Sequence, residues 1–190
     1  MIEKYYPDIY CDSIRHIDLS MLKNRGIRGL ILDIDNTLVP MHSADADENA
    51  ITWIAELKEK GFKVCILSNA AEKRVLRFNR EISVQAIHRA YKPSGRAFLR
   101  AAEKMELEPE NIAVVGDQIF TDIHGGNKAN MLTILVKPID KKEILFVRLK
   151  RWPEKYIISK YFKQQEHHIK RRDSWKKNSL IFEKSRYKNK

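Results

Sequence analysis

The sequence has few cysteines and no long apolar segment. Its 190 residues include 2 cysteines, Cys11 and Cys65, which is too few for the disulfide framework of a small secreted domain and favours a reducing, cytosolic setting. No window approaches the roughly 20 apolar residues that a transmembrane helix needs. Residues 1–8 contain no apolar run of the kind found in a secretory signal. We therefore expect a soluble protein, or one that binds a membrane only at its surface.

Positive charge is concentrated near the end of the chain. The net charge is +11, and residues 141–190 hold 17 lysines and arginines against 5 aspartates and glutamates, whereas residues 1–140 hold 19 against 20. This distribution predicts a neutral core domain over residues 1–140, including an N-terminal lead-in, and a basic, helical extension with a flexible tail over residues 141–190. The chain is long enough for one α/β domain of ordinary size but not for a second complete one.

Short apolar runs alternate with segments of helical periodicity between residues 29 and 136. This alternation predicts an α/β fold in which a five-stranded parallel sheet is covered by helices on both faces. The expected strands are residues 29–33, 63–69, 84–88, 111–117 and 132–136. The expected helices are residues 45–61, 75–82, 93–105 and 122–131.

Acidic residues follow two of the expected strands. Asp33 and Asp35 end the first strand, and because side chains alternate along a strand, they point to the same side with Cα atoms roughly 6.5 Å apart. Two such carboxylates repel each other unless a cation lies between them or one of them is protonated. Asp117 ends the fourth strand. If the first and fourth strands are neighbours where the strand order reverses, all three carboxylates meet in one crevice.

Four short motifs occur in order at the expected strand ends and loops. They are Asp33-Ile34-Asp35-Asn36-Thr37, Ser68-Asn69, Lys92-Pro93 and residues 116–122. Together they resemble the four motifs of the haloacid dehalogenase (HAD) superfamily of phosphatases. Residues 32–39 and 116–127 are similar, more narrowly, to HAD subfamily IIIA of the YqeG type and to mitochondrial phosphatidylglycerophosphate phosphatases. The resemblance covers residues 7–140 and implies a three-layer, Rossmann-like HAD fold.

The resemblance implies that the first motif carries the catalytic carboxylates. Asp33 would attack phosphorus to give an aspartyl-phosphate, and Asp35 would protonate the departing oxygen and then activate water. These roles suit a phosphoester, whose hydrolysis requires a nucleophile, charge neutralisation and a proton for the leaving group. We therefore expect a phosphoric monoester hydrolase.

The same resemblance implies a magnesium site. Mg²⁺ is a hard ion that prefers oxygen ligands, and it would be bound by Asp33, the backbone carbonyl of Asp35 and Asp117. Asp122 would complete or orient this set of ligands. The expected cofactor is therefore Mg²⁺.

The second and third motifs are expected to bind the phosphoryl group. Ser68 and Asn69 would hold its oxygens, and Lys92 would offset its charge during transfer. Considered alone, Ser68 and Asn69 are equally typical of a helix N-cap, and Lys92 of an exposed surface lysine. Their position between the acidic motifs favours the functional interpretation.

Two further interpretations compete with parts of this site. A phospho-accepting receiver domain also gathers acids at a first strand end, but it would need another acceptor aspartate at the third strand end, where residues 86–89 contain none. His124 resembles a catalytic base, yet the family assigns no chemistry to this position. We interpret His124 as structural or peripheral.

The spacing of the motifs leaves no room for a cap domain over the site. Residues 39–45 form only a short loop, and the segment between Asn69 and Lys92 is occupied by one expected helix and one expected strand. An open site favours phosphate carried on something large, such as a lipid, a nucleic acid end or a protein. The substrate class therefore depends on what the rest of the chain binds.

The basic extension favours an anionic surface as the partner. Apolar residues such as Ile158 and Tyr161 recur at helical spacing beside lysines such as Lys160 and Lys163, a pattern typical of helices at the headgroup boundary of a membrane. The leading hypothesis is hydrolysis of phosphatidylglycerophosphate by a cytoplasmic protein that is peripheral to the inner face of a membrane. The alternatives are a phosphatase for nucleic acid or phosphoprotein, or an RNA- or ribosome-binding adaptor on a HAD fold, since polyphosphate backbones attract the same charge.

Overall fold

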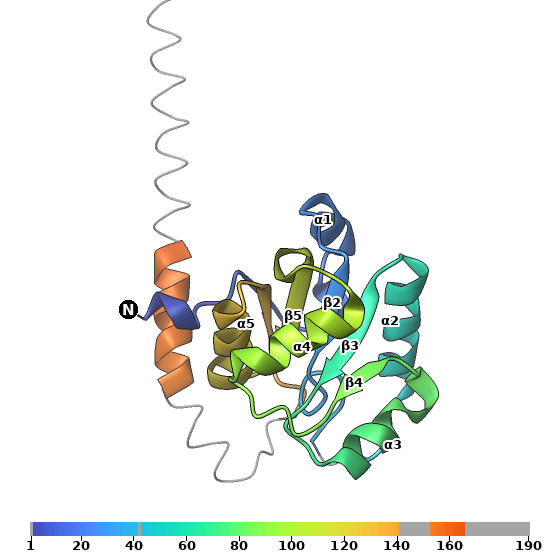
Figure 1. The fold of residues 1–190 in the computed structure, drawn as a ribbon. Helices are drawn as coiled ribbons and strands as arrows, with labels where there is room; N and C mark the ends of the chain where they lie inside the picture. Colours follow the sequence, from blue (N-terminus) through green and yellow to red (C-terminus); the bar gives the residue numbers. More distant parts are fainter. Residues whose placement is uncertain (1, 42, 141–152, 166–190) are drawn as a thin grey trace, which may run out of the picture. The chain divides into compact units, whose positions relative to one another are not determined.

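The computed structural model describes residues 2–41, 43–140 and 153–165, which divide into one unit within residues 1–150 and a second within residues 151–190. The first unit contains a six-stranded parallel sheet with the order β1-β6-β5-β2-β3-β4. Figure 1 labels β5, β2, β3 and β4 of this sheet. Its strands are β1 (Ile9–Cys11), β2 (Gly29–Leu32), β3 (Lys63–Leu67), β4 (Gln85–Ile87), β5 (Ile112–Gly116) and β6 (Leu132–Val136).

The sheet has one strand more than the five that the sequence predicts, and the strand count in that prediction was wrong. The additional strand is β1, which pairs with the edge of β6 through Ile9 and Ile134. It has three residues, all of them half-buried. A strand this short gives no alternation of apolar and polar residues, so no periodicity distinguishes it from a loop.

The helices cover most of the expected segments. They are α1 (Leu19–Asn24), α2 (Glu48–Glu59), α3 (Glu72–Ile82), α4 (Gly95–Met105) and α5 (His124–Lys128), with 3-10 turns at Glu3–Tyr5, Ile14–His16 and Pro109–Asn111. The helix α2 begins after Asp47, whose carboxylate accepts a hydrogen bond from the Ala50 amide at 2.8 Å. The helix expected over residues 122–131 is shorter, because a π-helical turn, η4 (Ile119–Ile123), precedes α5.

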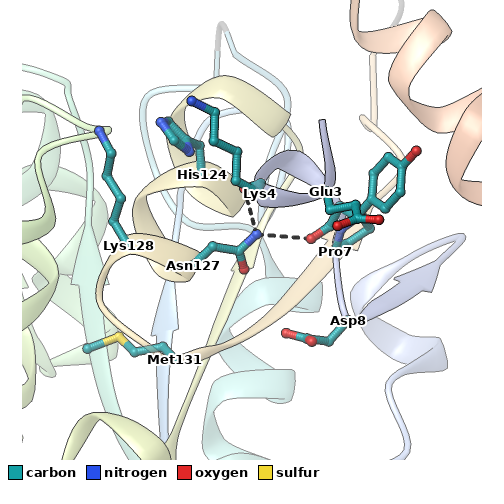
Figure 2. Close-up of a pocket in the computed structure, with 9 residues that line it drawn as sticks. Glu3, Lys4, Pro7, Asp8, His124, Asn127, Lys128 and Met131 are labelled. Atoms are coloured by element: carbon teal, nitrogen blue, oxygen red, sulfur yellow. Dashed lines mark hydrogen bonds between the residues drawn. The ribbon is translucent and has the colours of Figure 1, made fainter. Parts of the chain in front are cut away.

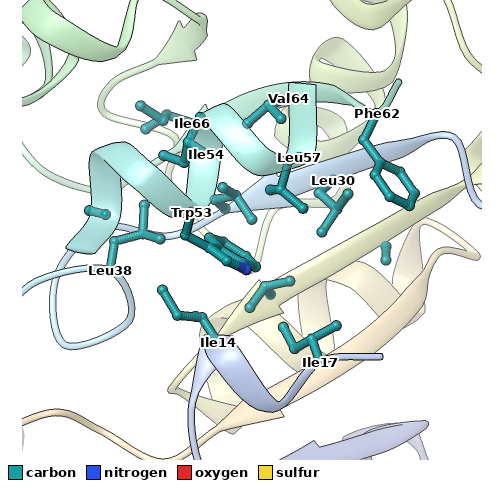
Figure 3. Close-up of a cluster of buried hydrophobic side chains, with 14 of the residues drawn as sticks. Ile14, Ile17, Leu30, Leu38, Trp53, Ile54, Leu57, Phe62, Val64 and Ile66 are labelled. Atoms are coloured by element: carbon teal, nitrogen blue, oxygen red, sulfur yellow. The ribbon is translucent and has the colours of Figure 1, made fainter. Parts of the chain in front are cut away.

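Alternate residues of the central strands face two different helical layers. Leu30 and Leu32 of β2 lie in a core with residues of α1, α2 and α3, whereas Ile31 lies in a second core with residues of α4. Figure 3 shows part of the first core, with Trp53 and Leu57 of α2 among its buried side chains. The sheet is therefore buried on both faces, which explains why its strands are almost continuously apolar.

The order of strands reverses beside β2. This strand pairs with β3 on one side and with β5 on the other, so the chain builds one half of the sheet and then crosses over to build the other. The condition stated for the carboxylates to meet, that the first and fourth expected strands are neighbours, is fulfilled. The pairing continues past the end of β2, where the Asp33 amide donates to the Val115 carbonyl at 3.0 Å, and the residues after β2 and β5 therefore meet at one edge.

Two segments on the site side of the sheet are short. Between β2 and α2 the chain makes a loop with one isolated bridge between Asp35 and Val39. Between Asn69 and Lys92 it forms α3 and β4. In the described residues, neither segment forms a separate cap domain over the strand ends.

The second unit is described over residues 153–165, which form one helix. The expectations for residues 144–152 and for residues 169–190 lie outside the described residues. Across the described ranges, none of the helices combines the length and the apolar character that crossing a bilayer would require.

A buried leucine and an exposed one test the assignment of the first core. Leu57 on α2 is completely buried, whereas Leu99 on α4 is 48% exposed. We expect Leu57→Ala to lower the free energy of unfolding by about 2–5 kcal/mol, because it removes buried methyl groups and leaves a cavity. The matched change Leu99→Ala should alter it by less than about 0.5 kcal/mol. Urea unfolding followed by circular dichroism measures the free energy of unfolding of both variants. Equal losses in the two variants would contradict the assignment of Leu57 to the buried core.

Candidate active site

Three buried carboxylates meet beyond the carboxyl ends of β2 and β5. Asp33, Asp117 and Asp122 each offer an oxygen, and these oxygens lie within 4.8 Å of one another. The three residues are between 1% and 8% exposed. Burial of like charges at this distance is costly unless cations compensate them. Asp33 and Asp117 therefore meet as the strand order implied, but the third carboxylate of the cluster is Asp122 and not Asp35.

Lys92 compensates part of this charge. Its ammonium lies 2.6 Å from Asp33 Oδ1 and 2.6 Å from Asp122 Oδ1, with 4% of its side chain exposed. Burial lowers the pKa of Lys92, but the charges of Asp122 and Asp33 outweigh it and hold the pKa above its ordinary value. Lys92 is therefore a buried cation shared by two carboxylates, not a solvated surface residue.

The pKa of Asp33 is raised to about 7, first because the carboxyl is buried and also because Asp122 and Asp35 are close, while Lys92 acts in the opposite direction. Only the ionised form of a carboxyl is a nucleophile. Any additional positive charge beside Asp33 would favour that form.

Thr37 lies between the two strand-end carboxylates. Its hydroxyl oxygen is 3.3 Å from Asp33 Oδ2 and 3.4 Å from Asp117 Oδ1, where its single proton can be donated to either. The chain turns at Asn36, just before Thr37. The φ of Asn36 is 64°, in the left-handed region that asparagine tolerates. No role was predicted for Thr37 from the sequence, although this residue ends the first motif.

Asp122 is fixed by the turn that follows β5. Its Oδ2 accepts hydrogen bonds from the Gln118 amide at 3.2 Å and from the Thr121 hydroxyl at 3.3 Å. The close approach requires a glycine at position 116, because a Cβ there would lie 2.3 Å from the carboxyl carbon of Asp122. The π-helical turn η4 thus presents Asp122 to Lys92 across the end of β5.

Ser68 and Asn69 do not cap α3, whose N-cap residue is Ala71. The Asn69 side chain instead accepts a hydrogen bond from the Lys92 amide at 2.7 Å and donates to the Lys92 carbonyl at 3.4 Å. The Ser68 hydroxyl oxygen accepts from the Ala70 amide at 3.1 Å. Asn69 therefore positions the backbone of Lys92, and contact of either residue with a phosphoryl group stays a prediction.

Asp35 contributes no oxygen to the cluster of three carboxylates and instead forms an ion pair with Arg74. Arg74 Nη2 is 3.0 Å from Asp35 Oδ1, and the two side chains are 19% and 26% exposed. Arg74 was not among the residues predicted from the sequence. Its position on an amphipathic helix gives no local signal, and its proximity to Asp35 follows only from how α3 lies beside the strand ends.

A separate cavity of about 570 Å³ lies beside α5 and the N-terminal lead-in (Figure 2). Its polar side chains hold these segments together: Asn127 donates to the carbonyls of Lys4 and Tyr6, and Asp8 accepts from the amide and hydroxyl of Thr133. His124 lines this cavity and contacts the Tyr5 ring at a centroid distance of 4.6 Å. Burial, together with the charges of Lys128 and Lys4, lowers the pKa of His124.

The clustered carboxylates suit a divalent metal ion. Asp33, Asp117 and Asp122 supply only oxygen atoms, they converge from two strand ends, and their charge exceeds that of Lys92. Hard cations such as Mg²⁺ prefer this kind of ligand set. The residues present therefore fit the ion that the motifs imply.

Comparison with known proteins identifies the family to which these features belong. Residues 2–140 match the family described as mitochondrial PGP phosphatase. The chain belongs to this family. Over 160 residues it is 41% identical to "Probable phosphatase YqeG" of Bacillus subtilis (strain 168), an alignment that covers 84% of this chain and 93% of that protein.

A more distant family relative comes from a plant. The chain is 29% identical over 173 residues to "Phosphatidylglycerophosphate phosphatase 1, chloroplastic/mitochondrial" of Arabidopsis thaliana, an alignment that covers 78% of this chain and 48% of that protein. The resemblance inferred from the four motifs is confirmed. The chain is thus a phosphatase, a phosphoric monoester hydrolase.

Solved structures agree on the fold. The cobalt-bound deoxy-D-mannose-octulosonate 8-phosphate phosphatase YrbI of Haemophilus influenzae superposes with a TM-score of 0.50 at 16% identity, covering 60% of this chain and 70% of that one. The predicted parallel α/β HAD fold is confirmed, with six strands where five were expected.

The contact between Gly116 and Asp122 yields a test of the site geometry. We expect Gly116→Ala to lower the free energy of unfolding by about 1–3 kcal/mol through overpacking. It should also reduce phosphatase turnover by about 100-fold, because Asp122 must move. Urea unfolding and hydrolysis of 4-nitrophenyl phosphate measure the two effects.

Gly95→Ala is the matched control for this change. The nearest atom to a Cβ at Gly95 is 3.7 Å away, which is an ordinary contact. This variant should retain stability and turnover. Wild-type turnover in Gly116→Ala would mean that the phosphatase does not depend on the observed position of Asp122.

Proposed function

We propose that the protein is a Mg²⁺-dependent phosphatase that acts through an aspartyl-phosphate, with phosphatidylglycerophosphate as its substrate. The observation that carries this proposal is the buried cluster of Asp33, Asp117 and Asp122 with Lys92 at the strand ends. It supplies a nucleophile, a ligand set for a cation and a fixed positive charge at one edge of the sheet. These are the requirements of phosphoryl transfer.

Asp33 is the proposed nucleophile. One oxygen contacts Lys92 and the other lies near Thr37, so the plane of the carboxylate is fixed from both sides. Attack by an Asp33 oxygen forms a bond to phosphorus while the bond from phosphorus to the leaving oxygen breaks. Lys92 would stay beside the transferring group and offset its negative charge.

Asp35 is the proposed acid and base. It lies two residues from Asp33 in the chain and is partly open to solvent. In the first step its proton passes to the leaving oxygen. In the second step it takes a proton from the water that attacks the aspartyl-phosphate, and this attack releases inorganic phosphate and restores Asp33.

Asp33, Asp117 and the backbone carbonyl of Asp35 would hold Mg²⁺, and Asp122 would complete or orient this ligand set. When bound, the ion supplies positive charge beside the phosphoryl oxygens and favours the ionised form of Asp33. Ser68 and Asn69 would contact phosphoryl oxygens from the neighbouring loop.

Three features support phosphatidylglycerophosphate as the substrate. The segments that could cover the site are short, so a phosphate on a large carrier can reach it. The Arabidopsis thaliana relative is named for this lipid. The described helix over residues 153–165 carries the exposed aromatic side chains of Tyr156 and Phe162 together with Lys155, Lys160 and Lys163, a combination suited to an anionic membrane surface. We therefore expect the protein to act in the cytoplasm as a peripheral protein on the inner face of a membrane.

Phosphate release from three substrates tests this proposal. Phosphatidylglycerophosphate in mixed micelles, with and without an anionic co-lipid, is compared with a 5′-phosphorylated oligonucleotide and a phosphopeptide at equal phosphate concentration. We expect the highest kcat/KM for the lipid, increased by the anionic co-lipid. An equal or higher value for the oligonucleotide or the phosphopeptide would favour those substrate classes instead.

Substitution of the nucleophile controls this experiment. Asp33→Asn should reduce turnover at least about 1,000-fold on every substrate, because the amide cannot attack phosphorus. Asp12→Asn, the same change at an exposed position, should leave turnover unchanged. Turnover that persists in Asp33→Asn would contradict the aspartyl-phosphate mechanism. Absence of turnover in the wild type on all three substrates would favour a binding role for the chain.

A further inference from the structure

Arg74 is fixed at three points beside the loop between β2 and α2. Its Nη2 lies 3.0 Å from Asp35 Oδ1, its Nη1 donates to the Ala44 carbonyl at 3.0 Å, and its guanidinium carbon lies 5.6 Å from the centroid of the buried Phe78 ring. A planar guanidinium held by two hydrogen bonds and an aromatic face has little freedom to rotate. The orientation of the Asp35 carboxylate is therefore set from α3.

A second arginine on the same helix shows what a purely structural contact looks like here. Arg77, about one turn further along, forms a two-point ion pair with Asp45, and both side chains are about half exposed. This pair already ties residue 45 to α3. Arg74 differs in two ways. Its side chain is more buried than that of Arg77, and its charged partner is Asp35, the proposed acid and base.

We propose that Arg74 is a positioning residue for Asp35. This inference rests on the proposed function, in which Asp35 gives a proton to the leaving oxygen. Arg74 contacts Oδ1, so in the proposed mechanism Oδ2 is the oxygen left to hold the proton that passes to the leaving oxygen. As the bond from phosphorus to that oxygen breaks, its electron pair stays on the oxygen and the Oδ2 proton joins it.

The inference predicts a dependence on the leaving group. An ester of 4-nitrophenol releases a stable anion that needs little help from an acid, whereas an ester of phenol releases a more basic oxygen that needs a proton. Because kcat/KM reports the steps up to formation of the aspartyl-phosphate, it isolates this event from the later attack by water. A misplaced Asp35 should therefore penalise phenyl phosphate more than 4-nitrophenyl phosphate.

The experiment measures kcat/KM for a series of substituted phenyl phosphates with wild type and Arg74→Ala. We expect the loss for phenyl phosphate to exceed the loss for 4-nitrophenyl phosphate by at least about 10-fold. Asp35→Asn should show the same trend more strongly. Added guanidinium should restore part of the loss in Arg74→Ala, and Arg74→Lys should be intermediate because one ammonium cannot reach both partners in the same geometry.

Arg77→Ala is the matched control, and it should change kcat/KM by the same factor for all esters or not at all. An equal loss for every ester in Arg74→Ala, or no loss, would overturn the positioning role. If Arg74→Ala fails to fold by circular dichroism, the same series with Arg74→Lys decides, and an unchanged dependence on the leaving group overturns the inference. Full turnover in Asp33→Asn would instead contradict the proposed function itself.

Discussion

The structure depends on compensation of negative charge that is buried at one edge of the sheet. Asp33 and Asp122 are each 2.6 Å from the ammonium of Lys92, and Asp117 lies in the same cluster. Removal of one partner from such a buried pair typically costs about 3–5 kcal/mol, because the other charge is left without compensation. Apolar residues at these positions would avoid the free-energy cost of burying charge. The charged residues are therefore best explained by the chemistry of the site.

The topology of the sheet brings these groups together. Because β2 lies between β3 and β5, the chain leaves the first motif, builds the β3 and β4 side with α3, and then returns beside its starting point. The loop after β3 positions the backbone of Lys92 through Asn69, and the turn after β5 presents Asp122. Each motif can be short because the fold brings the separate motifs together at one edge of the sheet.

The sequence predicted the parts of this arrangement that have a local signal. Asp33 and Asp117 follow uninterrupted apolar strands, so the strand ends and the meeting of these two carboxylates could be inferred from the sequence. By contrast, β1 has three residues and no periodicity, and it was missed. Thr37 and Arg74 were missed for another reason: their contacts with Asp33 and Asp35 arise from a left-handed turn and from the placement of a helix, which the residue pattern does not encode. The boundary between the core and the basic extension remains a prediction.

Anomalous diffraction from crystals of the full chain soaked in Mn²⁺, a spectroscopically visible substitute for Mg²⁺, tests the central claim most directly. We predict one strong peak in contact with the carboxylates of Asp33 and Asp117, within reach of Asp122, and its loss in Asp117→Asn crystals. Absence of a peak at this cluster at Mn²⁺ concentrations that support phosphatase turnover, or a peak at a different site that accounts for the metal requirement, would contradict it.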